Sequence, residues 1–276
     1  MKSIFSKQEQ QYIFDNYKQK TYRQIADDLG FTEVQVRGWV NNHLPKKNRQ
    51  FDDHYFDEIN LPDKAYWLGF IYADGWISSH EVSDGNGGKR LTYEFGVELD
   101  SNDEYILNEL NNALGGVHTI TRRHRIKNIA PYSRDSESFT SSLRIYSKNI
   151  CAGLNRNGVE YHKTLKDTYP VVADHLFLDF LRGYIDGDGC LYIMRDYLIV
   201  NITSSNKIGL EYIQNILRDQ YDVDTRVYSE TERKHRLVCY RSEDVKRLLD
   251  MIYYSEDTPK LERKYAIYRT FYGLAA

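Results

Sequence analysis

The stretch WLGFIYADG at residues 67–75 returns with few changes as LRGYIDGDG at residues 181–189. Both copies are apolar, carry small residues four positions apart and end in Asp-Gly. This pattern predicts a helix in each copy, with the small residues on one face. A carboxylate at the C-terminal end of a helix opposes the helix dipole and costs roughly 0.3–1 kcal/mol. The repetition of this unfavourable arrangement indicates that Asp74 and Asp188 act together.

The small residues suggest how the two acids meet. Gly69 and Ala73 share one helix face in the first copy, and Gly183 and Gly187 share one in the second. Small residues allow two helix backbones to approach closely. Helices packed along these faces would bring their terminal acids to one end. We expect the glycines at 75 and 189 to take positive φ and end the helices.

Two neighbouring carboxylates repel each other unless cations lie between them. Hard oxygen ligands favour Mg²⁺ or Mn²⁺, and such a site can cleave phosphodiester bonds. For either copy alone, a buried helix followed by a turn is an equally good interpretation. A calcium loop starting at Asp186 is excluded because its twelfth position, which requires Glu, is Tyr197.

Both segments resemble the LAGLIDADG motif of homing endonucleases. The second copy matches closely, including its lead-in at residues 180–184. The first has Trp67 in place of the leading Leu and Tyr72 in place of the acid at the sixth position. The resemblance extends over about residues 63–276. It implies a single chain with two repeats, each contributing half of one active site.

The resemblance also implies the roles of particular residues. Asp74 and Asp188 would bind the catalytic metal ions, Mg²⁺ or Mn²⁺, with the backbone carbonyls of Ala73 and Gly187 as further ligands. A lysine after the last strands of each repeat would stabilise charge at the scissile phosphate. Lys163 and Lys264 occupy the similar positions, and Lys260 and Arg263 are competing candidates for the second.

The order of predicted elements is αββαββα in both repeats, an α+β fold in which two pseudo-symmetric repeats form a DNA-binding saddle. Apolar residues alternate with polar ones from Thr92 to Leu99, the period of a half-buried strand. In the first repeat we predict strands near 76–82, 92–99, 117–126 and 139–146, and helices over 102–114 and from 147. In the second we predict strands near 190–195, 197–203, 223–230 and 235–241, and helices over 206–219 and from 242.

One face of each predicted sheet is free of helices and could contact duplex DNA. Arginine pairs well with guanine, and asparagine with adenine. Because side chains alternate along a strand, only some of the candidates can face DNA. The candidates are Arg122, Arg123, Arg125 and Arg144 in the first repeat, and Arg195, Asn201, Arg226, Arg236 and Arg241 in the second.

The first fifty residues predict three short helices that resemble a helix-turn-helix domain, with the third helix as the DNA reader. A protein-contact module is the alternative. Gln35, Arg37 and Asn41 are expected to face DNA, and Lys46, Lys47 and Arg49 to contact phosphates. We therefore predict a helix-turn-helix domain over 1–50, a linker over 51–62 and the two repeats over 63–169 and 170–276.

The net charge of −3 counts against a DNA-binding protein. Basic residues are nevertheless concentrated locally: residues 1–50 hold nine Lys or Arg against five Asp or Glu, and residues 119–148 hold seven against two. A local basic surface is sufficient for phosphate contact. No apolar run is long enough for a membrane span or signal peptide, and the three cysteines are isolated. We expect an intracellular protein, in the cytoplasm of a host cell or in an organelle.

The function predicted is that of a site-specific DNA endonuclease. The chain would act as a monomer and make a metal-dependent double-strand break at a long, asymmetric target. The family resemblance implies 5′-phosphate and 3′-hydroxyl ends with short 3′ overhangs. Two alternatives remain open on the same fold: a transcription regulator that binds DNA without cleaving it, and an RNA maturase. Retention of both acids argues against the regulator.

Overall fold

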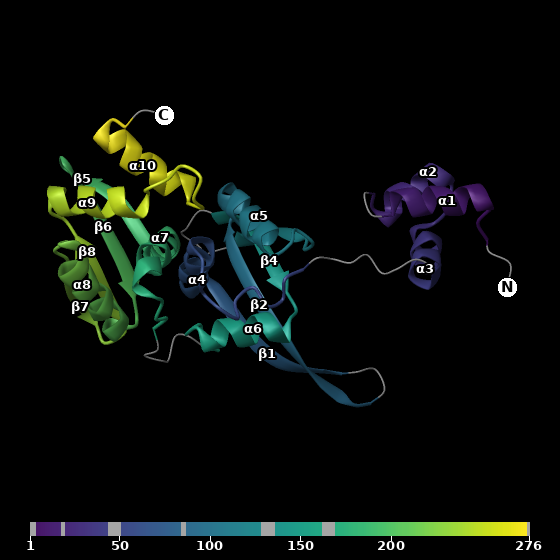
Figure 1. Ribbon diagram of the computed structural model, residues 1–276, viewed down its shortest axis with the longest axis horizontal. Coiled ribbons are helices and arrows are strands. Elements are labelled where there is room, and N and C mark those ends of the chain that lie inside the picture. The colour runs from purple at the N-terminus through teal and green to yellow at the C-terminus, as the bar shows by residue number, and fades with distance from the viewer. Residues whose placement is uncertain are drawn as a thin grey trace. The chain divides into compact units, whose positions relative to one another are not determined.

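The computed structural model describes residues 4–17, 20–43, 51–83, 87–127, 136–161 and 169–274. The chain divides into two units, Met1–Gln50 and Phe51–Ala276, each with its own hydrophobic core. We describe the two units separately (Figure 1). None of the helices in the described residues combines the length and apolarity needed to cross a membrane.

The N-terminal unit contains three helices, α1 (Lys7–Asn16), α2 (Tyr22–Leu29) and α3 (Glu33–His43). Capping boxes open α1 and α2, in which Ser6 pairs with Glu9 and Thr21 pairs with Gln24. Gly30 ends α2 in the left-handed conformation, with φ of 74°. Apolar residues spaced along the helices meet in a small core, as the sequence predicts. Its fully buried members include Ile13, Ile25 and Val36.

The larger unit contains two repeats with the same order of elements, which confirms the predicted αββαββα pattern. The first consists of α4 (Pro62–Asp74), β1 (Gly75–Ser83), β2 (Lys89–Asp100), α5 (Glu104–Ala113), β3 (Ile120–Lys127), β4 (Ser136–Ile145) and α6 (Lys148–Arg156). The second consists of α7 (Phe177–Asp188), β5 (Gly189–Met194), β6 (Tyr197–Ser204), α8 (Lys207–Tyr221), β7 (Arg226–Thr231), β8 (Lys234–Cys239) and α9 (Ser242–Ile252). A further helix, α10 (Glu262–Tyr272), follows the second repeat and was not predicted as a separate element.

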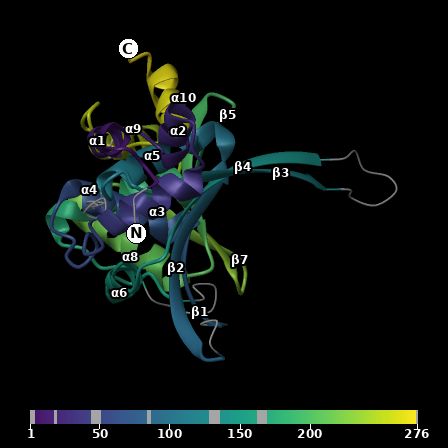
Figure 2. The same cartoon turned by 90° about the vertical axis from the view of Figure 1, so that its right-hand side faces the viewer.

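Each repeat forms a four-stranded antiparallel sheet, with strand orders β1-β2-β4-β3 and β5-β6-β8-β7. The sequence alternation is borne out in β2, where Phe95 and Val97 are fully buried against the helices. Their neighbours Glu94, Gly96 and Glu98 point to the opposite face. Figure 2 shows α4 and α6 on one side of β2. That leaves the other face of the first sheet open.

Candidate active site and nucleic-acid interface

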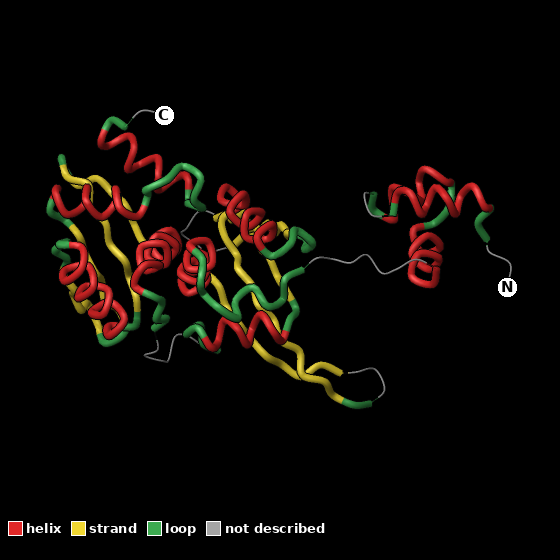
Figure 3. The backbone as a smooth tube through the Cα atoms, viewed as in Figure 1, coloured by secondary structure: helices red, strands yellow, loops and turns green. Residues whose placement is uncertain are grey.

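Helices α4 and α7 pack directly against each other between the two sheets (Figure 3). A Cβ added to Gly69 would overlap the carbonyl oxygen of Phe180 and fall 2.9 Å from the nitrogen of Tyr184. A Cβ added to Gly183 would likewise overlap the carbonyl of Tyr66. Only glycine permits this approach of one backbone to the other. The predicted packing of the two small-residue faces is confirmed.

The C-terminal ends of the two helices meet at the same level. A Cβ on Gly187 would overlap that of Ala73 and lie 3.3 Å from Oδ2 of Asp74. The Asp74 carboxylate therefore reaches the last turn of the opposite helix, one residue from Asp188. Asp188 is exposed and Asp74 is half-buried. The two motif acids thus lie at one solvent-accessible end of the helix pair.

The glycines after the motif acids do not take the positive φ that we expected. Gly75 has φ of −87° and Gly189 has φ of −77°, both in extended backbone. Glycine is needed there for space instead. A Cβ at Gly75 would fall 2.8 Å from Cγ2 of Ile71, and one at Gly189 would overlap the carbonyl of Ile185. Each strand therefore leaves its helix by turning tightly against the preceding helical turn.

Asp186, at the sixth position of the second motif, is a buried hydrogen-bond acceptor two residues before Asp188. It is fully buried and accepts hydrogen bonds from Tyr66 (3.0 Å), Tyr253 (3.0 Å) and the backbone amide of Leu261 (2.8 Å). Burial raises the pKa of this carboxyl above its ordinary value, and the Leu261 amide opposes the shift. Asp186 therefore joins both motif helices to the chain that leads into α10.

Tyr72 fills the matching position of the first motif and makes a different contact. Its hydroxyl accepts a hydrogen bond from Asn206 Nδ2 at 3.4 Å, and its ring packs edge-on against Tyr169 and Tyr184. The two motifs therefore differ at the sixth position, two residues before each terminal acid. The first motif replaces a buried carboxylate with an aromatic contact to the second repeat.

Lys264 lies at the site but is engaged with the protein backbone. Its ammonium donates to the carbonyls of Ile185 (2.8 Å), Asp186 (2.6 Å) and Gly187 (2.9 Å), the last turn of α7. The residue as a whole is 2 % exposed. Burial lowers the pKa of Lys264 from 10.5 to about 8. All three N–H groups are used, so direct contact with a phosphate would require the loss of a carbonyl bond.

The two competing candidates for the catalytic cation of the second repeat also form contacts within the protein. Arg263 donates to Asp103 at 2.9 Å, and Lys260 donates to the backbone carbonyl of Glu256. Lys163, the lysine predicted for the first repeat, lies outside the described residues, so its catalytic role stays a prediction.

The arginines of the first sheet divide between its two faces. Arg123, Arg125 and Arg144 lie on the open face, where all three surround Glu98. Arg122 instead points to the helix side and pairs with Glu104 of α5, at 2.5 and 2.6 Å. Because side chains alternate along β3, Arg122 does not share the open face with Arg123, Arg125 and Arg144, and its contact with DNA stays a prediction.

The candidates of the second sheet are more dispersed. Asn201 lies on the open face opposite Cys190, and Arg236 pairs with Glu230 at 2.6 Å. Arg226 stacks on Tyr240, with 5.4 Å between the guanidinium carbon and the ring centre. Two candidates lie beyond strand ends: Arg195, with φ of 56°, is in the turn between β5 and β6, and Arg241 is the N-cap of α9.

The residues of the N-terminal unit that were predicted to contact DNA differ in what the structure shows for them. Gln35 accepts a hydrogen bond from the Thr32 amide at 2.9 Å, so it completes a capping box in which Thr32 caps α3. Arg37 is exposed and paired with Glu33. Asn41 belongs to α3, but its side chain is outside the described ones. Lys46, Lys47 and Arg49 also lie outside the described residues.

Sequence reasoning missed Glu98 and the structural role of Asp186. The alternation in β2 placed Glu98 opposite the apolar residues, which was a usable signal. Its three arginine partners could not be identified from sequence because they come from β3 and β4.

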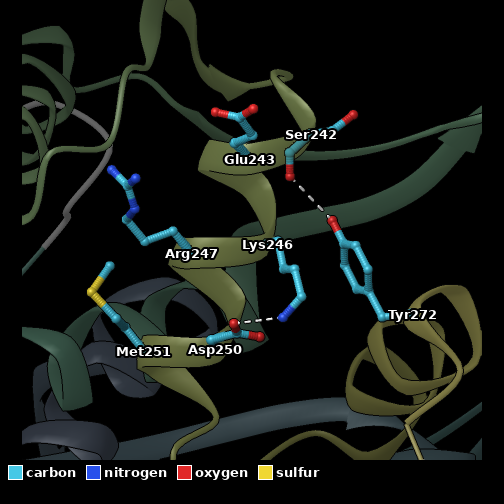
Figure 4. A pocket seen from close by; sticks show the side chains of 7 residues that line it. All are labelled: Ser242, Glu243, Lys246, Arg247, Asp250, Met251 and Tyr272. Carbon is cyan, nitrogen blue, oxygen red and sulfur yellow. Dashed lines mark hydrogen bonds and ion pairs between the residues drawn. The ribbon is translucent and has the colours of Figure 1, made fainter.

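A hollow on α9 and α10, lined by Ser242, Lys246, Asp250 and Tyr272 among others, contains neither motif acid (Figure 4).

The donor set at the helix ends fits a hard divalent cation. Asp74 and Asp188 offer carboxylate oxygens, and Ala73 offers its backbone carbonyl. The Gly187 carbonyl accepts a hydrogen bond from Lys264, and its second lone pair could face an ion. Among the described residues, no cluster of three or more His, Cys, Asp or Glu side chains could hold a metal. Ion binding here would therefore depend on the acid pair, backbone carbonyls, water and substrate oxygens. Such a site suits a hard divalent cation that retains water and binds substrate oxygens.

The fold and site define a duplicated α+β protein with one acidic site at the interface of its repeats. Residues 67–149 match a family model described as LAGLIDADG endonuclease, and residues 177–253 match one described as LAGLIDADG-like domain. The two matches together cover more than half of the chain. The protein belongs to the LAGLIDADG homing endonuclease family.

Solved structures support the same fold. A lysine-to-alanine mutant of I-SmaMI is 14% identical, with a TM-score of 0.53, over 78% of this chain and 90% of that chain. The meganuclease I-SmaMI bound to uncleaveable DNA is 15% identical, with a TM-score of 0.52, over 77% of this chain and 89% of that chain. I-SmaMI bound to cleaved DNA is 14% identical, with a TM-score of 0.50, over 79% and 89%.

Proposed function

We propose that this protein is a site-specific endonuclease that makes a Mg²⁺- or Mn²⁺-dependent double-strand break in a long, asymmetric DNA target. The observation that carries the proposal is the meeting of Asp74 and Asp188 at one exposed end of the α4–α7 pair. Each acid comes from a different repeat, so each strand of a duplex can have its own half of the site. The neighbours bound to DNA share this fold.

Asp74, Asp188 and the carbonyls of Ala73 and Gly187 would hold the ions. The ions, when bound, supply an activated water and stabilise charge on the phosphate. Lys264 fixes the last turn of α7 and so orients the Gly187 carbonyl and the Asp188 backbone. The open sheet faces would position the duplex over the acids, and the inequality of the two repeats would select an asymmetric sequence.

The N-terminal unit would extend the contact along the DNA. The outward face of α3 presents Val34, Arg37 and Asn42, all exposed, while Val36 and Val40 are buried in the core. This distribution suits a reading helix in a major groove. Replacing both Arg37 and Asn42 by Ala should shorten the footprint on the target at one end. An unchanged footprint would argue for a protein-contact role.

The central test selects bound sequences from a random duplex library and then measures cleavage with Mg²⁺, with Mn²⁺ and with EDTA. Asp188→Asn should abolish cleavage while leaving the dissociation constant for the selected duplex within about twofold, because the acid acts on the metals rather than on the DNA bases. Cleavage that persists in Asp188→Asn would refute the assignment. Selective binding by the wild type without cleavage under any of these conditions would instead indicate a transcription regulator.

A further inference from the structure

The open face of the first sheet carries a carboxylate at the centre of its arginines. Glu98 follows Val97 on β2, so its side chain points away from the buried core. The residue opposite Glu98 on β4 is Ser142, which is two residues from Arg144. On the far side of β4, Arg123 of β3 lies opposite Thr140. The Glu98 side chain is 19% exposed. The carboxylate is therefore enclosed on a face otherwise dominated by positive charge.

Four side chains converge on Glu98. Arg125 lies 3.0 Å from Oε1, and the Thr140 hydroxyl donates to the same oxygen at 3.0 Å. Arg144 and Arg123 lie 3.8 and 3.9 Å from Oε2. The carboxylate thus links three guanidinium groups from two strands.

Arg144 is further restrained on its other side. It donates to Glu94 at 3.2 Å and lies over the indole of Trp76, at 5.4 Å from the ring centre. The indole itself covers Gly96, where an added Cβ would overlap it. Trp76 is only two residues beyond Asp74. Arg144 is therefore held close to the start of the strand that leaves the catalytic helix.

A carboxylate in this position has two physical effects on DNA binding. It fixes the arginine rotamers before DNA arrives, which reduces the conformational entropy lost when they pair with bases. It also repels phosphates and neutralises part of the arginine charge, which weakens sequence-independent attraction. Both effects increase discrimination between sequences rather than total affinity.

The second sheet has no acid at the corresponding position. The strand register relates the two sheets: the pair Cys190–Asn201 in the second matches the pair Trp76–Gly96 in the first. Two residues further along the strand, Thr203 therefore corresponds to Glu98. Two residues earlier, Ile199 corresponds to Glu94. Because Glu98 and its three arginines all belong to the first sheet, its effect should be limited to the half of the target that the first repeat contacts.

We propose that Glu98 is a specificity-determining residue that holds Arg123, Arg125 and Arg144 as one base-reading unit in the first half-site. The inference rests on the proposed DNA-binding function. Removal of the Glu98 carboxylate should strengthen binding to non-specific DNA and weaken the preference for the selected sequence. Loss of a residue that only stabilises the fold would not produce these two opposite changes.

The test compares Glu98→Gln with Glu104→Gln. Glu104 is a matched control, because it is also a glutamate that pairs with an arginine of β3, but on the helix side of the sheet. Both variants remove one negative charge. Glu98→Gln removes the shared ionic partner of three arginines, and Glu104→Gln removes that of Arg122 alone. Dissociation constants would be measured in EDTA at several salt concentrations, on the duplex selected by the wild type and on a scrambled duplex of equal length.

For Glu98→Gln we expect about threefold tighter binding to the scrambled duplex, with a salt dependence steeper by about one unit. The preference for the selected duplex should fall by about tenfold, the lower part of the range for one base-reading arginine. Sequence preference in a repeated selection should relax in one half-site only. Glu104→Gln should change each quantity by less than about twofold, since its arginine faces away.

Equal behaviour of the two variants, or relaxation in both half-sites, would overturn the proposal. If Glu98→Gln does not fold, Glu98→Asp replaces it. Aspartate keeps the charge but withdraws the carboxylate by one methylene. It should lose preference in the first half-site without tighter binding to scrambled DNA, and full retention of that preference would overturn the proposal. A wild type that selects no sequence would refute the proposed function instead.

Discussion

The Tyr66 hydroxyl donates a 3.0 Å hydrogen bond to Oδ2 of Asp186 across the interface of the two motif helices. The donor lies on α4 and the acceptor on α7, and both side chains are fully buried. Buried polar groups are costly unless paired. This bond, together with those from Tyr253 and Leu261, therefore couples the correct packing of the helices to the satisfaction of one carboxylate.

Replacing Asp186 by Ala should lower the free energy of unfolding by about 2–4 kcal/mol, because two buried hydroxyls and one amide lose their acceptor. Urea denaturation followed by circular dichroism measures this. Tyr66→Phe is the control, since it removes a single donor and should cost about 1 kcal/mol. An Asp186→Ala protein as stable as the wild type would show that these groups find other partners.

The same substitution, glycine to alanine, should have opposite effects at a glycine in the α4–α7 interface and at an exposed glycine of α3. Gly69→Ala should destabilise the larger unit by about 2–3 kcal/mol, because its Cβ would overlap the Phe180 carbonyl. Gly38→Ala should stabilise α3 by about 0.5–1 kcal/mol, because nothing lies within 4 Å of the added Cβ. Thermal unfolding of each variant would test both signs. A stabilising Gly69→Ala would contradict the close helix packing.

Lys264→Met should lower the free energy of unfolding by about 2–4 kcal/mol and also reduce cleavage. The substitution removes the charge-assisted hydrogen bonds to the last turn of α7. Urea denaturation and a cleavage assay on the same preparation would separate the two effects. Loss of cleavage with an unchanged unfolding midpoint would mean that the amine acts on the phosphate and contributes little to the helix end.

The Glu104–Arg122 pair predicts an acid-dependent contribution to stability. The hydrogen bond from Arg122 lowers the pKa of Glu104 from 4.5 to about 2. Since the folded state has the lower pKa, the pair stabilises the protein above pH 4.5, and this contribution is lost as pH falls from 4.5 towards 2. The difference in unfolding midpoint between wild type and Glu104→Gln should shrink over that interval. A constant difference would exclude the ionised pair as its source.

Local patterns predicted the order of elements because they depend on near neighbours in the chain. The alternation from Thr92 to Leu99 reflects one face of one strand, and the spacing of Gly69 and Ala73 reflects one face of one helix. Individual contacts were predicted less well. Arg122 and Arg123 are adjacent and chemically alike, yet they point to opposite faces and bind different glutamates.

The sequence by itself determined the duplication, the two terminal acids and the αββαββα order, since each follows from residue type and period along the chain. Only the tertiary structure decided the partners of Lys264, Asp186 and Glu98. These partners come from segments tens of residues away, as when Thr140 bonds Glu98 across the sheet. Strand register and helix packing decide which distant groups meet, and both depend on the whole core rather than on any local stretch.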